Sequence, residues 1–208
     1  MVINLRQSIR SEIRLKRRLL GKEDQHNAAK LLLTQLAQHK KIQTAKHIAL
    51  YLANDGELDP MFFIQWCWSK GKEVYLPVIH PFNKSNLLFL RYAENTKLQT
   101  NKFGILEPLL NVNDVCPVSS LDVLCTPLVA FDHSGARLGM GGGFYDRTLA
   151  KWFSQQDNKT SSNLDKINHS NFHPIGIAHD CQLVDSIPIE HWDIPLPEVI
   201  TPSKCYQF

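Results

Sequence analysis

The amino-acid sequence predicts an α/β fold, in which a single domain holds a mostly parallel, Rossmann-like sheet flanked by helices. Helical periodicity alternates with short, strand-like apolar runs along the 208 residues, which is typical of this class. A hydrophobic content of 43% is enough for one sizeable core, and no internal repeat divides the chain. We therefore expect one domain over residues 1–208, with a flexible polar loop at 154–172 that contains few apolar residues.

Two helices and a strand are expected in the first quarter of the chain. Leucine and isoleucine recur near helical spacing over 4–20, and a second apolar stripe runs over 23–39. The run HIALYLAND, at 47–55, is apolar and ends in turn residues, which favours a buried strand. Two amphipathic helices therefore precede the first strand.

The next helix has signals for both of its ends. Asp59 is placed to cap it, Pro60 suits its first turn, and Gly71 follows its last residue. We expect a helix over 59–71 and a strand over 72–79.

The second half of the chain continues the alternation. Strand-like runs occupy 86–92, 121–132 and 173–180, and helical spacing returns over 144–153. Prolines punctuate the tail at 186–204, for which we expect an extended path along the surface.

Composition and charge exclude several classes of protein. The net charge of +3 is too small to indicate nucleic-acid binding by itself, and no apolar run approaches the roughly 20 residues of a membrane span. The basic N-terminus lacks the apolar centre of a signal peptide. The five cysteines show no C-x-x-C spacing, and the histidines match no zinc pattern. We expect a cytoplasmic protein with reduced cysteines and no zinc site.

The segment RLGMGGGFYDRTL, at 137–149, places four glycines within five positions between an arginine and the start of a helix. It lacks the third glycine of a dinucleotide fingerprint and the lysine of a Walker A loop. Glycines at a helix N-terminus still let backbone N–H groups approach a phosphate, to which Arg137 can add a bidentate donor and Asp146 a Mg²⁺ ligand. The alternative is that the glycines only permit a tight turn and that Asp146 is an ordinary acid of a first helical turn.

Four arginines form one stripe along the first helix: Arg6, Arg10, Arg14 and Arg17. Such a stripe is typical of a solvated basic face. Two alternatives remain open. Arg6 and Arg10 could contact a polyphosphate, or the face could bind RNA, although no aromatic residues interleave with it.

Two isolated acids are further candidates. Glu57 follows a predicted strand, at the edge of an α/β sheet where ligands bind. Its carboxylate could accept two parallel hydrogen bonds from an amino-heterocycle, or it could be a loop acid that faces water. Asp193 would matter only if the tail folds back onto the glycine segment.

Six segments, in order along nearly the whole chain, match one known family: RQSIR (6–10), YLANDGELD (51–59), YLPVIHPF (75–82), FGILEP (103–108), TPLVAFDHSGARLGMGGGFYDRTL (126–149) and DCQLVDSIPIEHWDIPLPEVIT (180–201). They resemble the 5-formyltetrahydrofolate cyclo-ligase family, and its bacterial members in particular. Their occurrence together is far more specific than the glycine run alone.

This resemblance implies an enzyme that uses ATP and Mg²⁺ to cyclise 5-formyltetrahydrofolate to 5,10-methenyltetrahydrofolate, with release of ADP and phosphate. A formamide oxygen leaves poorly, so the resemblance implies transfer of the γ-phosphoryl group to the formyl oxygen before N10 attacks. It further implies a monomer that binds a small-molecule folate, with or without a polyglutamate tail, and neither membrane nor nucleic acid.

The resemblance also implies roles for individual residues. Arg137 and Tyr145 would be catalytic, Asp146 and Asp193 would ligate Mg²⁺, and the folate would contact Leu52, Glu57 and Phe103. The implied ATP contacts are Arg6, Arg10, Arg137, Leu138, Gly139, Met140, Gly141, Gly142, Gly143, Phe144 and Tyr145. Arg6 stands where the family usually has lysine, and Phe103 where it usually has tryptophan.

Overall fold

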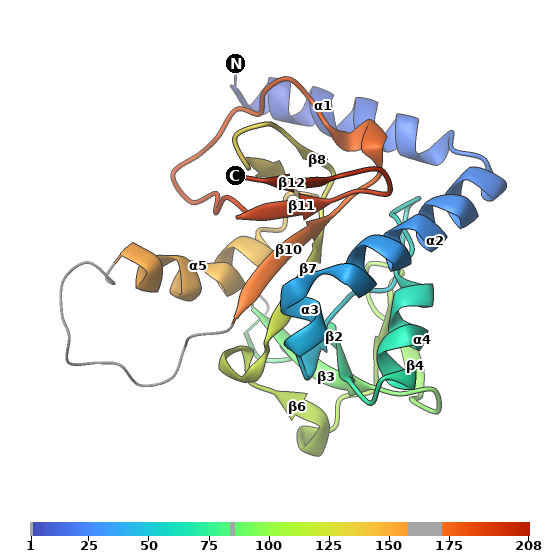
Figure 1. Ribbon diagram of the computed structural model, residues 1–208. Coiled ribbons are helices and arrows are strands. Elements are labelled where there is room, and N and C mark those ends of the chain that lie inside the picture. Colours follow the sequence, from blue (N-terminus) through green and yellow to red (C-terminus); the bar gives the residue numbers. More distant parts are fainter. Residues whose placement is uncertain (1, 84–85, 158–171) are drawn as a thin grey trace.

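An eight-stranded sheet runs through the centre of the molecule (Figure 1). The computed structural model describes residues 2–83, 86–157 and 172–208. In their order across the sheet, the strands are β12 (Cys205–Gln207), β11 (Glu198–Ile200), β10 (His173–Ile177), β7 (Val123–Pro127), β1 (His47–Ala49), β2 (Glu73–Ile79), β3 (Leu87–Tyr92) and β6 (Val115–Cys116). Neighbours from β11 to β2 pair in parallel, whereas β12, β3 and β6 pair antiparallel. The predicted α/β class with a mostly parallel sheet is confirmed.

Helices and short strands surround this sheet. The helices are α1 (Val2–Arg18), α2 (Lys22–Gln38), α3 (Lys40–Thr44), α4 (Met61–Ser69) and α5 (Phe144–Asp157), with 3₁₀ turns η1 (Val112–Asp114), η2 (Val118–Ser120) and η4 (Asp180–Gln182). Two antiparallel pairs lie outside the main sheet: β4 (Leu98–Thr100) with β5 (Leu106–Pro108), and β8 (Ala130–Phe131) with β9 (Arg137–Leu138). The N-cap of α4 is Pro60 and not the expected Asp59, although the backbone N–H of Met61 donates to Asp59 Oδ1 at 2.9 Å.

The core lies on both faces of the main sheet, because successive side chains of a strand point to opposite sides. On β7, Val123 and Cys125 pack into the cluster that also contains Leu32 of α2. Leu124, between them, packs on the other face with Leu149 of α5. Helices α2, α3 and α4 thus cover one face and α5 covers the other.

Helix α1 covers a third apolar cluster, which lies over the β8–β9 hairpin. Ile13 of α1 is buried there against Val129, Ala136 and Leu138. This packing places one face of α1 on the segment that leads into the glycines.

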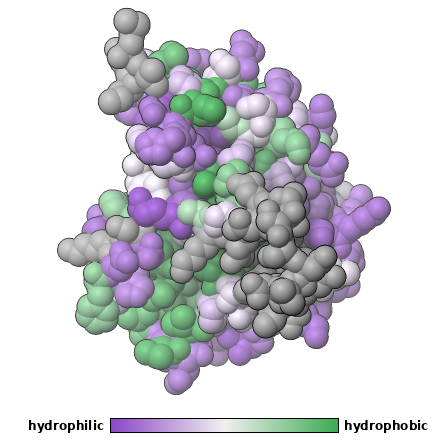
Figure 2. Space-filling view, turned by 90° about the vertical axis from the view of Figure 1, so that its left-hand side faces the viewer, coloured by the Kyte–Doolittle hydropathy of each residue, from purple (hydrophilic) through white to green (hydrophobic). Residues whose placement is uncertain are grey.

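Hydrophobic residues also remain on the surface. Figure 2 shows them gathered over the lower part of one face, at the height at which Figure 1 draws β3 and β6. Between β5 and β6, the side chains of Leu109, Leu110 and Val112 are exposed. In the part of the chain that the structure describes, no helix is both long enough and apolar enough to cross a membrane.

The strand expected over 47–55 is shorter than predicted. It ends at Ala49, and the following residues form the loop that carries Glu57. The chain turns there because Asp55 and Gly56 take left-handed φ angles of 53° and 75°, which a strand does not allow.

The strand expected over 121–132 is two strands. β7 ends at Pro127, which has no N–H to continue a ladder, and β8 pairs with β9 instead of with the main sheet. Between them, the carbonyls of Leu128 and Val129 accept hydrogen bonds from the side chain of Gln182, at 2.7 and 3.0 Å. A side chain therefore replaces the partner strand at this point.

The C-terminal part differs from expectation at three places. The strand at 173–180 ends at Ile177. Helix α5 continues to Asp157, so the first residues of the loop expected at 154–172 are helical, and residues 158–171 lie outside the described residues. The tail at 186–204 does not simply run along the surface, because it supplies β11, which is buried, and β12 follows directly after it. The short elements α3, β4, β5 and β6 contain too few residues for a periodic signal.

We expect Gly135→Ala to destabilise the fold more than Gly104→Ala. Both glycines have left-handed φ angles, of 82° and 76°, so both variants carry a backbone strain of about 1–2 kcal/mol. Only the new Cβ at position 135 would lie 2.8 Å from a backbone oxygen, that of Leu196, and this clash adds about 1–3 kcal/mol. Urea unfolding followed by tryptophan fluorescence measures both losses. Equal losses would contradict the close approach at Gly135.

Candidate functional site

Two loops meet at one edge of the sheet, where neighbouring parallel strands end. β1 leads into the loop that carries Glu57, and β7 leads through the β8–β9 hairpin into residues 137–145, which we call the glycine loop. Because β1 and β7 pair in parallel, both loops leave from their carboxyl ends. Helix α1 lies across this edge (Figure 1).

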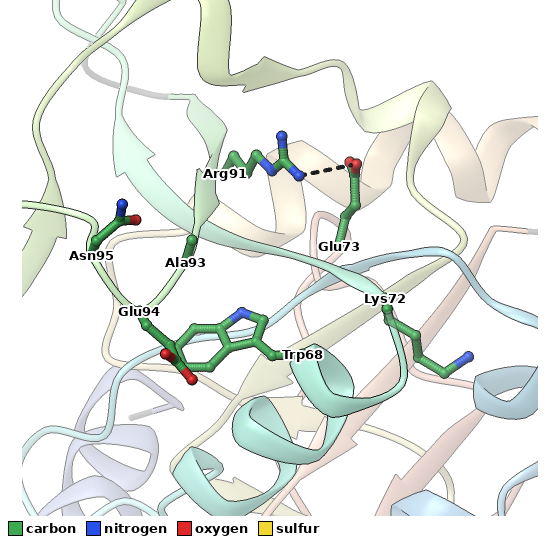
Figure 3. A pocket seen from close by; sticks show the side chains of 8 residues that line it. Trp68, Lys72, Glu73, Arg91, Ala93, Glu94 and Asn95 are labelled. Atoms are coloured by element: carbon green, nitrogen blue, oxygen red, sulfur yellow. Dashed lines mark ion pairs between the residues drawn. The ribbon is translucent and has the colours of Figure 1, made fainter.

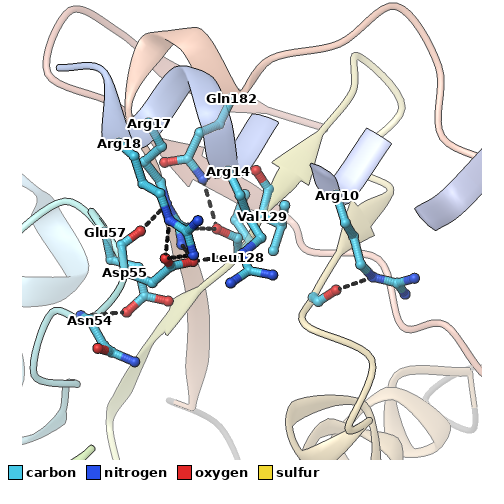
Figure 4. A network of polar contacts seen from close by, with 11 residues as sticks. Arg10, Arg14, Arg17, Arg18, Asn54, Asp55, Glu57, Leu128, Val129 and Gln182 are labelled. Atoms are coloured by element: carbon cyan, nitrogen blue, oxygen red, sulfur yellow. Dashed lines mark hydrogen bonds and ion pairs between the residues drawn. The ribbon is translucent and has the colours of Figure 1, made fainter. Parts of the chain in front are cut away.

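A single carboxylate, that of Asp55, binds three arginines of α1 (Figure 4). Arg14 Nε donates to Asp55 Oδ2 at 2.7 Å, Arg17 Nη2 donates to the same oxygen at 3.1 Å, and Arg18 pairs with Oδ1. Burial raises the pKa of the Asp55 carboxyl, but the arginines lower it further, so that the net shift is downward. We call these four residues the Asp55 clamp, and they fix α1 to the loop that carries Glu57.

The interpretation of the arginine stripe as a solvated face is wrong. The side chain of Arg17 is fully buried, and its Nε also donates to the backbone carbonyl of Asp55 at 3.0 Å. Arg10 reaches the glycine loop, where its Nε donates to the carbonyl of Gly139 at 2.8 Å (Figure 4). Arg6 pairs with Asp193 of the tail. The stripe therefore joins α1 to three separate segments.

The glycine loop leaves its backbone open on the way to a helix N-terminus. Gly141 and Gly143 take left-handed φ angles of 99° and 64°, and a Cβ at Gly139 would meet no atom within 4 Å. Arg147, in the first turn of α5, donates from Nη2 to the carbonyl of Gly142 at 2.7 Å and so holds the end of the loop. A defined path with open backbone before a helix is an arrangement that binds phosphate.

Arg137, at the start of this loop, is buried with only part of its guanidinium bonded. Its Nη2 donates to Asp146 Oδ1 at 2.5 Å, whereas its Nη1 is buried and has no hydrogen-bond partner among the residues that the structure describes. Burial lowers the pKa of Arg137, and the charges of Asp146 and Asp193 oppose that shift. A buried donor without a partner is costly, so this nitrogen is placed for a ligand oxygen.

Asp146 and Asp193 lie close to the same two arginines. Arg6 donates to both oxygens of Asp193, one of them at 3.0 Å, and this hydrogen bond raises the pKa of Arg6, with a smaller contribution from the charge of Asp146. Burial raises the pKa of Asp193, but Arg6 lowers it further. The tail does fold back onto the glycine loop, and it brings a second carboxylate to Arg137.

Glu57, in the loop after β1, interacts electrostatically with Tyr145, in the glycine loop. Burial raises the pKa of the Glu57 carboxyl to about 7, although the charge of Arg17 and a backbone hydrogen bond from Asn54 lower it. Burial and the charge of Glu57 both raise the pKa of Tyr145, so its phenol stays protonated at neutral pH. Tyr145 is therefore a hydrogen-bond donor next to an acid that titrates near neutrality.

The remaining candidates have different surroundings. Phe103, in the turn between β4 and β5, meets Phe144 edge to face, with the ring centroids 6.4 Å apart. Leu52 packs against the core face that α2 covers. The side chain of Leu138 is fully buried under α1, so only its backbone can face a ligand, whereas Met140 is 54% exposed.

A pocket of about 540 Å³ lies elsewhere, between the end of α4 and strands β2 and β3 (Figure 3). Arg91 and Glu73 pair across it at 3.4 Å. Glu73 is the first residue of a parallel strand, so this pocket is at the amino ends of the strands, away from the glycine loop. None of the candidate residues above lines it.

Sequence patterns assign no role to Asp55, Arg147 and Gln182, and they place Arg17 only in the arginine stripe. The Asn-Asp-Gly turn was an available signal for Asp55, because such a turn favours a left-handed residue. No pattern reveals the burial of Arg17, since the same spacing fits a solvated stripe.

Comparison with known proteins decides the family. The sequence model of the 5-formyltetrahydrofolate cyclo-ligase family matches residues 2–202. The chain belongs to this family. The 5-formyltetrahydrofolate cyclo-ligase of Escherichia coli (strain K12) is 48% identical over 196 residues, which cover 94% of this chain and 100% of that one. That of Haemophilus influenzae is 48% identical over 195 residues, with coverages of 94% and 96%.

Solved structures agree with the cyclo-ligase fold. The NMR structure of Aquifex aeolicus 5,10-methenyltetrahydrofolate synthetase is 25% identical, with a TM-score of 0.77 and coverage of 98% of this chain and 92% of that one. A 5,10-methenyltetrahydrofolate synthetase from Mycoplasma pneumoniae is 21% identical, with a TM-score of 0.68 and coverages of 95% and 98%, and shows the fold alone. The resemblance found in the sequence is confirmed.

We expect Asp55→Ala to destabilise this cyclo-ligase by about 3–5 kcal/mol, because it leaves the buried charge of Arg17 unpaired. Glu12→Ala is the matched control. It breaks an exposed i,i+4 ion pair with Lys16 on the same helix, which solvent screens, so the loss should be small. Urea unfolding gives both free energies. A loss at Asp55 no larger than that at Glu12 would show that the clamp does not hold α1.

Proposed function

We propose that this member of the cyclo-ligase family converts 5-formyltetrahydrofolate to 5,10-methenyltetrahydrofolate, with consumption of ATP in the presence of Mg²⁺ and release of ADP and phosphate. The observation that carries the proposal is the unpartnered Nη1 of Arg137, buried beside the open backbone of the glycine loop. The relatives whose names state this activity cover nearly the whole chain.

The glycine loop suits the phosphates of ATP. Arg137 would direct its free nitrogen, and the loop its backbone N–H groups, at phosphate oxygens. Arg10 holds the loop through Gly139, and its guanidinium lies near Gly141, since a Cβ there would be 3.8 Å from Nη2. ATP supplies the phosphoryl group that turns the formyl oxygen into a leaving group. These donors would position the phosphates and stabilise the negative charge that develops during transfer.

Asp146 and Asp193 would hold Mg²⁺. Both are carboxylates, which are the hard oxygen ligands that this ion prefers, and both act electrostatically on Arg137. Each is bonded to an arginine on one side, Asp146 to Arg137 and Asp193 to Arg6, which orients the carboxylate. Mg²⁺ would neutralise negative charge on the same phosphate groups that Arg137 would contact.

The other loop would bind the folate. The carboxylate of Glu57 would accept two parallel hydrogen bonds from the amino-pyrimidine edge of the pterin, and Leu52 and Phe103 would supply apolar contact. Tyr145 would donate its protonated hydroxyl at the junction of the two loops, where the formyl group and the phosphate meet. Arg137 and Tyr145 are the proposed catalytic residues.

We also propose the compartment in which the enzyme acts and its oligomeric state. The five free cysteines support a reducing compartment, and we take this to be the cytoplasm. The enzyme would act as a monomer, and it would accept the folate with or without a polyglutamate tail.

The direct test is the appearance of methenyl-folate absorbance after the protein is mixed with 5-formyltetrahydrofolate, ATP and Mg²⁺. The proposal requires a rise that stops when either ATP or Mg²⁺ is omitted. No rise from folded protein that binds ATP would remove the folate from the proposal and leave an ATP-dependent enzyme for another formylated or amide substrate.

Arg137→Ala should lower kcat/KM by about one to two powers of ten, because a charge-assisted hydrogen bond to phosphate is worth roughly 1.5–3 kcal/mol. Arg91→Ala, in the pocket at the opposite edge, removes another arginine–carboxylate pair and should leave the rate unchanged. Steady-state absorbance kinetics measures both. An unchanged rate for Arg137→Ala would end its assigned role.

Substrate affinity should rise with pH through the titration of Glu57. A group with a pKa of about 7 is roughly one-tenth ionised at pH 6 and nine-tenths ionised at pH 8, so binding to the carboxylate should tighten about tenfold over this range. Glu57→Gln should bind weakly and without this slope. Quenching of tryptophan fluorescence by the folate gives the affinities. The same slope in both proteins would exclude Glu57 as its source.

A further inference from the structure

Three potential metal ligands converge at the edge of the sheet opposite to the glycine loop. His173 and Glu198 are the first residues of the parallel strands β10 and β11, and His39 lies in the link between α2 and α3. One potential ligand atom from each residue lies within 4.8 Å of the others. β10 alone spans roughly 13 Å from His173 to its carboxyl end, so this group is separate from the site described above.

The distances within the group are those of ligands around one ion. Glu198 Oε1 lies 2.9 Å from His39 Nε2 and 3.6 Å from His173 Nε2. Two ligands of a tetrahedral zinc ion, each at about 2.0–2.2 Å from it, are separated by roughly 3.3–3.5 Å. The imidazole rings lie nearly parallel, 17° apart in plane, with their centroids 6.0 Å apart.

The same residues hold unsatisfied polar atoms. Among the described side chains, His39 Nδ1, His173 Nε2 and Glu198 Oε1 are buried and make no hydrogen bond of good geometry, although Glu198 Oε1 lies within ion-pair distance of both histidines. The side chains of Glu198, His39 and His173 are 5%, 15% and 20% exposed, so water reaches the histidines more than the carboxylate.

The geometry points to a binding site for a divalent transition-metal ion of the zinc class, held by His39, His173 and Glu198. Two imidazoles with one carboxylate suit Zn²⁺ and its neighbours better than Mg²⁺ or Ca²⁺, which prefer oxygen ligands alone. The fourth position would be taken by water from the exposed side of the histidines. Bound metal would join the α2–α3 link to two central strands and stabilise the fold.

The sequence conceals this group because its ligands come from three distant segments. The residues between His39 and His173, and between His173 and Glu198, far exceed the short spacings of zinc motifs. The expectation that the histidines form no zinc site rested on their spacing along the sequence. Such spacing does not reveal ligands that only the fold brings together.

The test is titration of the full-length, EDTA-treated protein with Zn²⁺ in excess Mg²⁺, followed by isothermal titration calorimetry. Wild type should bind one Zn²⁺, and His39→Asn and Glu198→Gln should bind it at least about tenfold more weakly. His47→Gln is the matched control. His47 lies 3.4 Å from Glu73 at the same edge but, among the described residues, belongs to no group of three potential ligands, so this variant should bind as wild type does.

If Glu198→Gln does not fold, two further measurements on wild type and His39→Asn still test the site. Co²⁺ bound to wild type should give the intense visible bands of a tetrahedral site, and His39→Asn should lose them. Zn²⁺ should raise the melting temperature of wild type but not of His39→Asn. No binding by wild type, or equal binding by wild type and His39→Asn, would overturn the site and leave a metal-free ion pair of Glu198 with its histidines.

Discussion

The buried pair of Arg17 with Asp55 is the interaction on which the site depends. A guanidinium that is fully removed from water must be paired. Its partner is Asp55, which has a left-handed φ angle in the loop after β1. Because arginines repeat along α1, fixing Arg17 sets the position of the others. Arg10 then reaches the glycine loop and Arg6 reaches the tail. One ion pair thereby orders three segments that are far apart in the sequence.

The charges at the carboxyl edge alternate, and under the proposed function this alternation would prepare the site for an anion. Of the two proposed Mg²⁺ ligands, Asp146 pairs with Arg137 and Asp193 pairs with Arg6. The charge of Asp193 also acts to raise the pKa of Arg137, and the charge of Asp146 acts to raise the pKa of Arg6. Within the described part of the chain, nitrogen Nη1 of Arg137 has no acceptor. An arrangement of this kind needs little reorganisation when a phosphate arrives, which is the condition for electrostatic stabilisation of a transfer reaction.

The sequence predicts the layers of this fold better than its strand ends. Alternating helices and apolar runs are local signals, and they place α2, α4 and α5 correctly. The break after Pro127 depends on the distant side chain of Gln182, and β11 lies in a proline-rich segment that has no strand-like period. The glycine loop was visible as a motif, whereas the burial of Arg17 and the group around Glu198 arise only when distant segments meet.

The most direct measurement is a crystal structure of the protein with a non-hydrolysable ATP analogue and Mg²⁺. We expect the terminal phosphate to accept a hydrogen bond from Nη1 of Arg137, the glycine loop to surround the triphosphate, and the metal to lie against Asp146 and Asp193. A triphosphate bound in the pocket between Arg91 and Lys72, with Arg137 still unpartnered, would contradict it.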